Sequence, residues 1–477
     1  MLQDRLRLLF GRRWSEQAYK PVGEDDSGLN EQDAEASLSD SSSAQSLKFS
    51  WVNYFIFLWM GVSMLWAWNC FLAAAPYFQL RFADNEWLRT NSQSAITSVF
   101  SVTALGAHFI LVKLQKNASY TRRVMVSLVL IGCVFTLLAA STITAQEIPA
   151  GLLFAFVLLM VFGSSLASSM NQNGLFAYVS KFALPEYTQA IMAGQGVAGV
   201  LSCAVQLVSA VSVPQGSDKD VNDEVKMNKS SHSARSAFAF FSAATAVAGF
   251  AAVAFYYLTQ RQIEEQQYAA PIFTNESARY LNRADTDVED ESRTPIRTVV
   301  PLKTLLRKLR WSAFAIFICF MVTMVFPIFA SQIQSVNTED PPPRYAQPDI
   351  FITLGLLFWN IGDLLGRLVV ILPPVKQLIR LPFILFLLSL ARILFIPLFF
   401  MCNVRGRGGR IHSDFVYLIL VQGLFGATNG CVSASTMMGI TFLVESDERE
   451  AAGAFMGLIL VAGLAAGSLM SFFIGSA

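Results

Sequence analysis

The segment Phe351–Pro373, FITLGLLFWNIGDLLGRLVVILP, is long enough to cross a membrane but carries Asn360, Asp363 and Arg367 near its centre. On insertion scales an Asp or Arg at the centre of a spanning helix costs about 2.5–3.5 kcal/mol, so such residues are rare there without a function. Their i, i+3, i+7 spacing places the three side chains on one stripe of a helix whose other residues suit lipid. The stripe indicates a transport pathway; an ion pair that only locks two helices together is the alternative.

The composition is typical of a membrane protein. Hydrophobic residues make up 54% of the 477 residues and charged ones 14%, whereas a soluble domain carries about 25% charged residues. The formal net charge is +1, and no basic stripe interleaved with aromatics occurs, which argues against a nucleic-acid partner. The six cysteines lie in or beside apolar segments without CxxC or Cys/His spacing, so we expect no disulfide framework, no metal site and no cofactor.

Apolar runs of about 20 residues predict an all-α polytopic membrane protein with eleven spanning helices. The predicted spans lie near 51–79, 93–113, 122–144, 150–181, 188–213, 236–258, 311–333, 350–373, 381–401, 414–441 and 451–474. The longest of them exceed a straight crossing of about 30 Å, so we expect them to tilt, kink or extend beyond the bilayer.

The polar segments divide the chain into four regions. Residues 1–50, rich in Ser, Asp, Glu and Gln, are predicted to form a disordered cytosolic tail. Residues 51–258 hold spans one to six and residues 310–477 hold spans seven to eleven. Between them, residues 259–309 carry both signs of charge and are predicted to form a cytosolic loop.

The distribution of Lys and Arg predicts the orientation. More than twice as many of these residues lie in the segments on the amino-terminal side of the membrane as on the other side, which favours a cytosolic amino terminus. Eleven spans then place the carboxyl terminus in the lumen or outside the cell. The sequon Asn228-Lys-Ser would face the same side and is a candidate for glycosylation.

Polar and aromatic residues recur in the middle of other spans. Trp66 and Trp68 lie in mid-span one, although tryptophan favours the membrane interface, so they suggest a platform for a flat aromatic ligand, with packing as the alternative. Span four contains SSLASSMNQNGLF, in which Gln172 offers both a donor and an acceptor. In span seven, Phe326 precedes Pro327, which frees a backbone carbonyl and permits a kink.

Several of these motifs together resemble a known family. They are LWAWNCFLAAAPYFQLRF at 65–82, LPEYTQAIMAGQGVAG at 184–199, NIGDLLGR at 360–367, RILFIPLF at 392–399 followed by Cys402-Asn403, and GATNG at 426–430. In order and spacing, along nearly all of residues 51–477, they resemble the equilibrative nucleoside transporters, and span one is most similar to the fungal, vacuolar-type branch. The resemblance implies six plus five helices in pseudo-symmetric halves of the major-facilitator type, working by alternating access.

The resemblance also implies site residues. The residues expected to contact substrate are Leu65, Trp68, Leu72, Gln172, Phe326, Asn360, Asp363 and Arg367. In this assignment Trp68 stacks near the nucleobase, Gln172 hydrogen-bonds the base, and Asp363 with Arg367 holds the ribose hydroxyls and the base edge. Structural roles are expected for Pro327, Arg392, Asn429 and Gly430.

The sequence departs from the family pattern at three positions. Ala67 stands where many members have proline, Ser168 where animal members often have glycine, and Gly362 where an aromatic residue is common. The resemblance therefore leaves the exact base preference and the inhibitor sensitivity open.

The chemistry of a nucleoside fits these residue types. A carboxylate accepts from two vicinal hydroxyls, a guanidinium donates to a ring nitrogen or exocyclic oxygen, and an indole supplies a stacking face. The spans contain no phosphate-binding Gly-rich loop or Lys/Arg cluster, so nucleotides should be rejected. We therefore predict a facilitative transporter of nucleosides, with nucleobases as a second substrate class.

Other functions remain as alternatives. A proton-coupled nucleoside or nucleobase symporter would need Asp363 to titrate, although no second acid lies well inside a span to relay the proton. A carrier for sugars or amino acids is weakened by the set of Trp68, Gln172, Asp363 and Arg367. A membrane enzyme would need paired aspartates, a Ser/His pair or a metal site, so we expect no enzyme. The fungal resemblance implies a vacuolar or other internal membrane, with the plasma membrane as the alternative.

Overall fold

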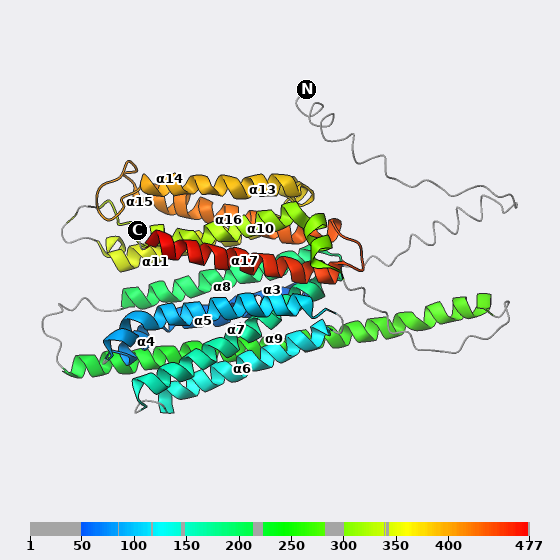
Figure 1. The fold of residues 1–477 in the computed structure, drawn as a ribbon, viewed down its shortest axis with the longest axis horizontal. Helices are drawn as coiled ribbons and strands as arrows, with labels where there is room; N and C mark the ends of the chain where they lie inside the picture. Colours follow the sequence, from blue (N-terminus) through cyan, green and yellow to red (C-terminus); the bar gives the residue numbers. More distant parts are fainter. Residues whose placement is uncertain are drawn as a thin grey trace, which may run out of the picture. The chain divides into compact units, whose positions relative to one another are not determined.

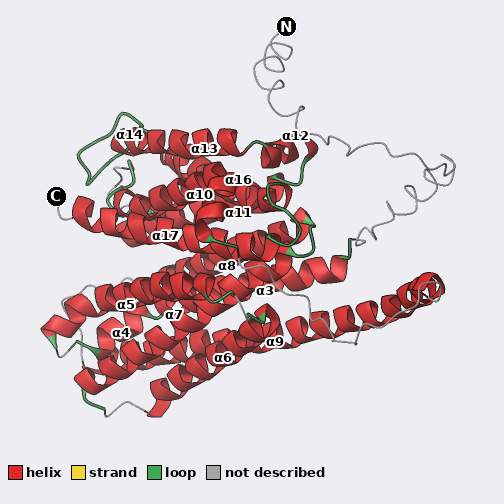
Figure 2. Cartoon of the chain, turned by 45° about the vertical axis from the view of Figure 1, so that its right-hand side comes forward, coloured by secondary structure: helices red, strands yellow, loops and turns green. Residues whose placement is uncertain are grey.

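The computed structural model describes residues 49–83, 85–115, 118–144, 148–212, 223–281, 300–337, 339 and 343–475. Residues 1–48, almost the whole of the predicted disordered tail, lie outside the described residues. Almost every described residue outside the connecting loops is helical (Figure 2).

Eleven helical segments of the described chain are long and apolar enough to cross a membrane, as the sequence predicted. The first six are α3 (Trp51–Ala73) continued by α4 (Ala75–Arg81), α5 (Glu86–Lys113), α6 (Tyr120–Thr144), α7 (Ala150–Ser180), α8 (Pro185–Ser212) and α9 (Asp223–Leu281). The other five are α10 (Leu302–Ala330), α11 (Pro348–Val369), α13 (Pro382–Ala391) with α14 (Phe395–Phe400), α16 (Leu424–Gly439) with its flanking turns, and α17 (Arg449–Gly475).

The helices next to the predicted loop 259–309 are longer than the hydropathy indicates. Helix α9 continues to Leu281, and α10 already begins at Leu302 behind the N-capping Pro301. Hydropathy marks only the apolar part of a helix, whereas Gln, Glu, Lys, Arg and Leu are all good helix formers. The polar ends of both helices are therefore continuous with their spans.

Span nine is interrupted near its middle, and span ten is irregular near its beginning. In span nine a 3₁₀ turn, η3 (Arg392–Leu394), separates α13 from α14. Pro397 lacks the N–H that would bond to the Ile393 carbonyl, which explains the break. Span ten contains a π-helical segment, η4 (Tyr417–Gly423), before α16. Irregular turns of these kinds inside helices often mark functional sites or hinges.

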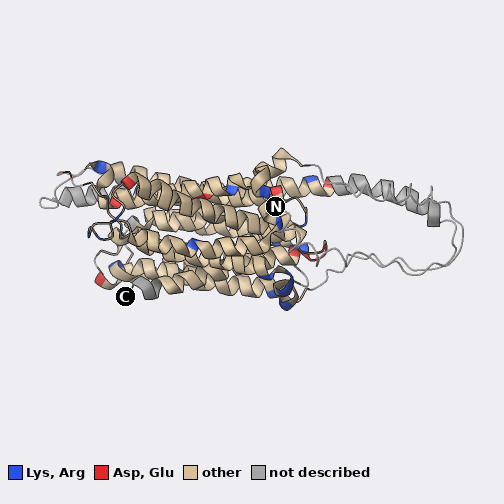
Figure 3. Cartoon of the chain, turned by 90° about the horizontal axis from the view of Figure 1, so that it is seen from above, with Lys and Arg blue, Asp and Glu red and all other residues tan. Residues whose placement is uncertain are grey.

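The helices run side by side in two groups, α3–α9 and α10–α17 (Figure 1). Helix α8 packs on α3 within the first group and on α11 and α16 of the second. Helix α17 packs on α10 within the second group and on α7 and α5 of the first. Charged residues gather at the two ends of the helices and are sparse between them (Figure 3), as the low dielectric of a bilayer requires.

Helices α11 and α16 cross at glycines. Gly362 of α11 faces the backbone carbonyl of Gly423, and Gly430 of α16 faces that of Asp363. A methyl group at either position would overlap the facing carbonyl oxygen. Small residues permit such close contact between membrane helices, and here they bring Asn429 within reach of the Asp363 carboxylate.

Candidate functional site

Asp363 and Arg367 form a buried ion pair on α11. Arg367 Nε donates to Asp363 Oδ2 at 2.7 Å, and both residues are at most 6% exposed. The other carboxylate oxygen, Oδ1, accepts from Asn429 Nδ2 of α16 at 2.6 Å. The predicted spacing thus produces an i, i+4 pair, and a neighbouring helix fixes the orientation of the carboxylate.

Arg367 also joins the two groups of helices. Its Nη1 donates across to α8, to the Met192 carbonyl at 2.7 Å and to Gln195 Oε1 at 3.1 Å. In return, Gln189 Nε2 of α8 donates to the Arg367 carbonyl at 3.0 Å. Gln195 Nε2 in turn contacts Met64 Sδ of α3 at 2.9 Å. Arg367 therefore lies at the junction of the two halves.

A second set of polar side chains lies on the Oδ1 side of Asn429, whose Nδ2 bonds to Asp363. Thr323 Oγ1 of α10 lies 2.8 Å from Asn429 Oδ1 and 2.8 Å from the Cys319 carbonyl oxygen, two acceptors that compete for its one hydroxyl proton. Arg392 donates from Nη2 to Thr323 Oγ1 at 3.1 Å and from Nη1 to the Cys319 carbonyl at 2.7 Å. The 3₁₀ turn η3 thus places a second buried guanidinium against Thr323, which in turn contacts Asn429.

Phe326, predicted to contact substrate, is packed into the aromatic core of the second half. Its ring stacks on Phe425 with centroids 3.6 Å apart, and it lies edge-on to Phe399. Arg392 also packs over the Phe425 ring, with its Cζ 4.4 Å from the ring centroid. Phe326 is only 2% exposed, so in this conformation its ring is enclosed by the neighbouring aromatic side chains. Pro327 lies inside α10, which continues past it.

Asn360, the third member of the α11 stripe, lies against α8. Its Nδ2 donates to the Leu356 carbonyl at 2.8 Å and contacts Cys203 Sγ at 3.2 Å. Its Oδ1 faces Gly199 of α8. Gly199 is next to Ala198, whose carbonyl accepts from Asn69 of α3 at 3.3 Å. Asn69 and Asn360 therefore contact consecutive residues of α8.

The predicted residues of span one lie on α3, within one turn of Asn69. Leu65 and Trp68 are half-buried and Leu72 is 37% exposed. The Trp68 ring lies 4.5 Å from that of Phe100 on α5, at an angle of 42°. Trp68 therefore already has one aromatic neighbour, which supports its ring from one side.

Three groups expected to bind substrate have unused donors. Gln172 of α7 is half-buried and makes no hydrogen bond within the described part of the chain. The indole N–H of Trp68 and Nη2 of Arg367 likewise make no hydrogen bond within the described part of the chain. No hydrogen bond joins Trp68 or Gln172 to Asp363 or Arg367 in the described structure. These groups remain available to a ligand.

Gln189, Gln195, Cys319 and Thr323 were not among the predicted site residues. The glutamines lie in the motif LPEYTQAIMAGQGVAG, where polar side chains in an apolar span were a readable signal. Thr323 and Cys319 carried no such signal, because Thr and Cys are common in spanning helices. Asn228 lies in the first turns of α9, but its side chain is outside the described part, so its glycosylation stays a prediction.

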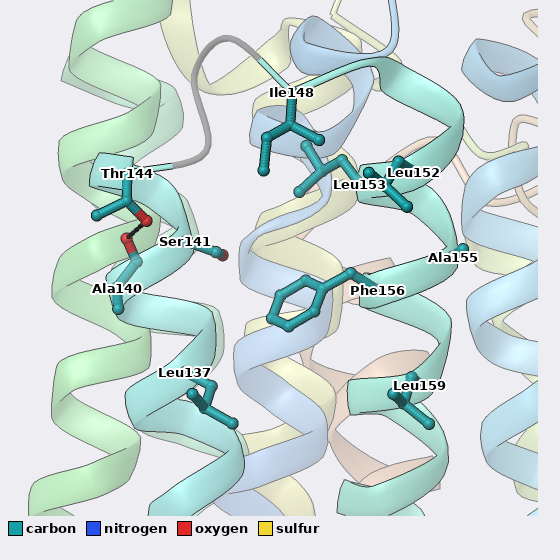
Figure 4. Close-up of a pocket in the computed structure, with 10 residues that line it drawn as sticks. All are labelled: Leu137, Ala140, Ser141, Thr144, Ile148, Leu152, Leu153, Ala155, Phe156 and Leu159. Carbon is teal, nitrogen blue, oxygen red and sulfur yellow. Dashed lines mark hydrogen bonds between the residues drawn. The ribbon is translucent and has the colours of Figure 1, made fainter.

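A separate groove lies between the ends of α6 and α7, with a volume of about 580 Å³ (Figure 4). Its lining is almost wholly apolar and includes Leu137, Phe156 and Leu159. None of the predicted site residues lines it, and a polar solute would find few partners there. Within the described residues, no group of three or more His, Cys, Asp or Glu side chains is placed to hold a metal ion.

Comparison with known proteins assigns the family. The family model described as nucleoside transporter matches residues 158–476. This chain belongs to the nucleoside transporter family. The nucleoside transporter FUN26 of Saccharomyces cerevisiae is 30% identical over 443 residues, which cover 88% of this chain and 83% of that protein. Equilibrative nucleoside transporter 1 of Homo sapiens is 26% identical over 466 residues, covering 88% and 96%.

Solved structures of other transporters share the fold of this nucleoside transporter family member. The Major Facilitator Superfamily transporter FucP, in the outward conformation, superimposes with a TM-score of 0.54 at 15% identity, covering 89% of this chain and 93% of that one. The human organic anion transporter MFSD10 gives 0.52 at 14% identity, covering 88% and 92%. The predicted major-facilitator-like fold is confirmed.

Proposed function

We propose that this protein carries nucleosides across its membrane by facilitated diffusion, with nucleobases as a second class of substrate. The observation that carries the proposal is the Asp363–Arg367 pair, buried at the junction of the two halves with donors to spare on Arg367. A carboxylate suits the vicinal hydroxyls of ribose, and a guanidinium suits the edge of a base. Trp68 and Gln172 add a stacking face and an amide.

The same contacts suggest how binding is linked to movement. Arg367 on α11 is tied to Met192 and Gln195 on α8 across the junction. At one end of the helices, Lys376 of α12 (Pro373–Lys376) pairs with Glu186 of α8 at 2.8 Å. A bound nucleoside would compete for the donors of Arg367 and weaken its hold on α8. Alternating access then requires these cross-junction bonds to open and close once per cycle.

Proton coupling has less support than facilitated diffusion. Within the described spans, Asp363 is the only acidic residue away from the helix ends. Both of its oxygens are engaged, one by Arg367 and the other by Asn429. A proton relay would need a second titrating acid, which the described spans do not provide.

Uptake by purified protein in proteoliposomes tests the proposed function. We expect labelled adenosine and uridine to equilibrate across the membrane with or without a pH gradient, and glucose to be excluded. Uptake of uracil would establish the second substrate class. Failure of both nucleosides to enter would refute the proposal, and accumulation driven only by a proton gradient would select the symporter.

Substitutions at Trp68 and Asp363 should separate recognition of the base from that of the sugar. We expect Trp68→Leu to weaken nucleosides and nucleobases alike, because stacking is worth about 1–3 kcal/mol per base. Asp363→Asn should weaken uridine but leave 2′,3′-dideoxyuridine unaffected, because that analogue lacks the two hydroxyls. Competition assays measure both, and equal losses for the two ligands in Asp363→Asn would contradict the division.

The membrane and the orientation are also proposals. The similarity to FUN26 and the charge distribution support an internal, vacuolar-type membrane with the amino terminus in the cytosol. Nucleosides released in a degradative lumen would then flow to the cytosol. A fluorescently tagged chain should label internal membranes; labelling of the plasma membrane alone would overturn the location and leave the transport chemistry intact.

A further inference from the structure

The groove between α6 and α7 opens to the lipid. Both helices are among the membrane-spanning segments. Leu137, Leu152 and Leu159 line the groove and are each more than half exposed. Apolar side chains exposed within a span contact lipid, because the bilayer core holds no water. The groove has a volume of about 580 Å³, within the range of about 300–1,000 Å³ that suits a compact organic ligand. Such a ligand would enter from the bilayer.

Two side chains of α7 form a wall of the groove. Phe156 points toward α6, and Leu153, one turn nearer the start of α7, points the same way (Figure 4). Leu153 is 3% exposed and belongs to a hydrophobic cluster of the first half, against which Phe156 packs. Side chains packed on a core sit in fixed rotamers. This wall favours a rigid ligand, because neither partner then loses much conformational freedom on binding.

The polar side chains that line the groove, Ser141 and Thr144, both belong to α6. Ser141 Oγ donates to the Leu138 carbonyl at 2.7 Å, and Thr144 Oγ1 donates to the Ala140 carbonyl at 3.0 Å. Each hydroxyl has thus used its one proton within its own helix and offers lone pairs to a ligand. None of the described residues that line the groove is charged. The groove therefore suits an uncharged ligand that brings a hydrogen-bond donor.

The groove begins near the membrane surface. Trp87 of α5 is 62% exposed and packs edge-on against Phe154, near the start of α7, and tryptophan favours the membrane–water interface. At the same end, Arg81 of α4 donates to the carbonyl of Ile148, a residue that lines the groove. The lining residues of α6 reach about 10 Å deeper, from Thr144 inward. A ligand would thus place its polar end toward the surface and its apolar body toward the bilayer centre.

We propose that this groove binds a sterol, whose hydroxyl donates to Ser141 or Thr144 and whose ring system lies against Phe156. A sterol is uncharged, has one hydroxyl at one end, and has a flat, rigid body. A phospholipid would bring a charged head group, for which the lining side chains provide no partner. The sterol would hold the ends of α6 and α7 together, away from the proposed nucleoside site.

Photolabelling of the full-length protein tests the proposal. The purified protein is placed in phosphatidylcholine vesicles with a diazirine analogue of cholesterol, irradiated, and digested for mass spectrometry. We expect label in the segments of α6 and α7 that line the groove. Unlabelled cholesterol should displace it, whereas cholesteryl methyl ether, which has no donor, should not. Label spread evenly over the lipid-facing helices, or unaffected by cholesterol, would overturn the proposal.

Variants at the groove test its shape and its polar end separately. We expect about tenfold less label in Ser141→Trp, because Ser141 points between the helices (Figure 4) and an indole there would occupy the space of the sterol. Ser141→Ala combined with Thr144→Val removes both acceptors. Its label should fall about five- to tenfold, because the hydroxyl of the ligand is then left unpaired away from water.

The matched controls are Thr136→Trp and Thr136→Val, because Thr136 is exposed on α6 outside the groove. Both should be labelled as wild type is. Full labelling of Ser141→Trp would overturn the site. If Ser141→Trp does not fold, the variant without the two hydroxyls decides, and full labelling there would overturn the choice of ligand.

A second probe distinguishes a sterol from a phospholipid chain. A phosphatidylcholine with a diazirine in its acyl chain should label the groove only weakly, and cholesterol should displace it. Strong labelling that cholesterol does not displace would identify an acyl chain as the occupant and overturn the proposal. None of the residues lining the groove belongs to the proposed nucleoside site, so these results do not depend on transport.

Discussion

Arg367→Ala is expected to abolish nucleoside uptake while the protein still reaches its membrane. The change leaves Asp363 as an unpaired buried charge, and breaking a buried pair in this way costs about 3–5 kcal/mol. It also removes the bonds to Met192 and Gln195 that join α11 to α8. Initial rates of uridine uptake, normalised to the amount of protein in the membrane, measure the effect.

The matched control is Arg307→Ala, because Arg307 is exposed on α10. Its uptake should stay close to that of wild type. Near-normal uridine flux in Arg367→Ala would contradict the assignment of the site. Loss of the folded protein, with no folded but inactive fraction, would favour an ion pair that only locks the helices together.

Gly430→Ala should have a comparably large effect, through packing. The added methyl would overlap the backbone carbonyl oxygen of Asp363 and push α16 away from α11. Overpacking of this kind costs about 1–3 kcal/mol, and the shift would lengthen the bond between Asn429 and Asp363. We expect uridine uptake to fall by more than tenfold and the thermal unfolding temperature in detergent to drop.

Gly249→Ala on α9 provides the control for this prediction. An added methyl there meets no atom within 4 Å, and alanine favours a helix over glycine by about 1 kcal/mol. The unfolding temperature of Gly249→Ala should therefore be unchanged or higher, with normal uptake. Equal behaviour of the two variants would mean that the close crossing at Gly430 is not required.

The sequence predicted the parts of this structure that depend on local patterns. Eleven apolar runs gave the eleven spans, and the spacing of Asp363 and Arg367 placed them in reach of one another on α11. Hydropathy does not reveal the polar continuation of α9 to Leu281, because it measures apolar content and not helix propensity. Local patterns thus locate spans better than helix ends.

Contacts between helices could not be read from a single sequence. The bond from Asn429 to Asp363 depends on the register of α16 against α11, which glycines on both helices set together. In the same way, Phe326 was expected beside the substrate, but its stacking on Phe425 depends on how α10 packs on span ten. A structural role for Arg392 could be predicted from the sequence. Its contacts toward Asp363 could not, because they depend on how several helices pack against one another.

Counterflow tests the central claim, that this protein is a facilitative nucleoside carrier, most directly. Proteoliposomes preloaded with unlabelled uridine are diluted into a trace of labelled uridine, with a protonophore present to remove any proton gradient. A carrier working by alternating access predicts transient accumulation of label above its equilibrium level, unchanged by the protonophore. Absence of the overshoot, or its loss when the protonophore is added, would contradict the account.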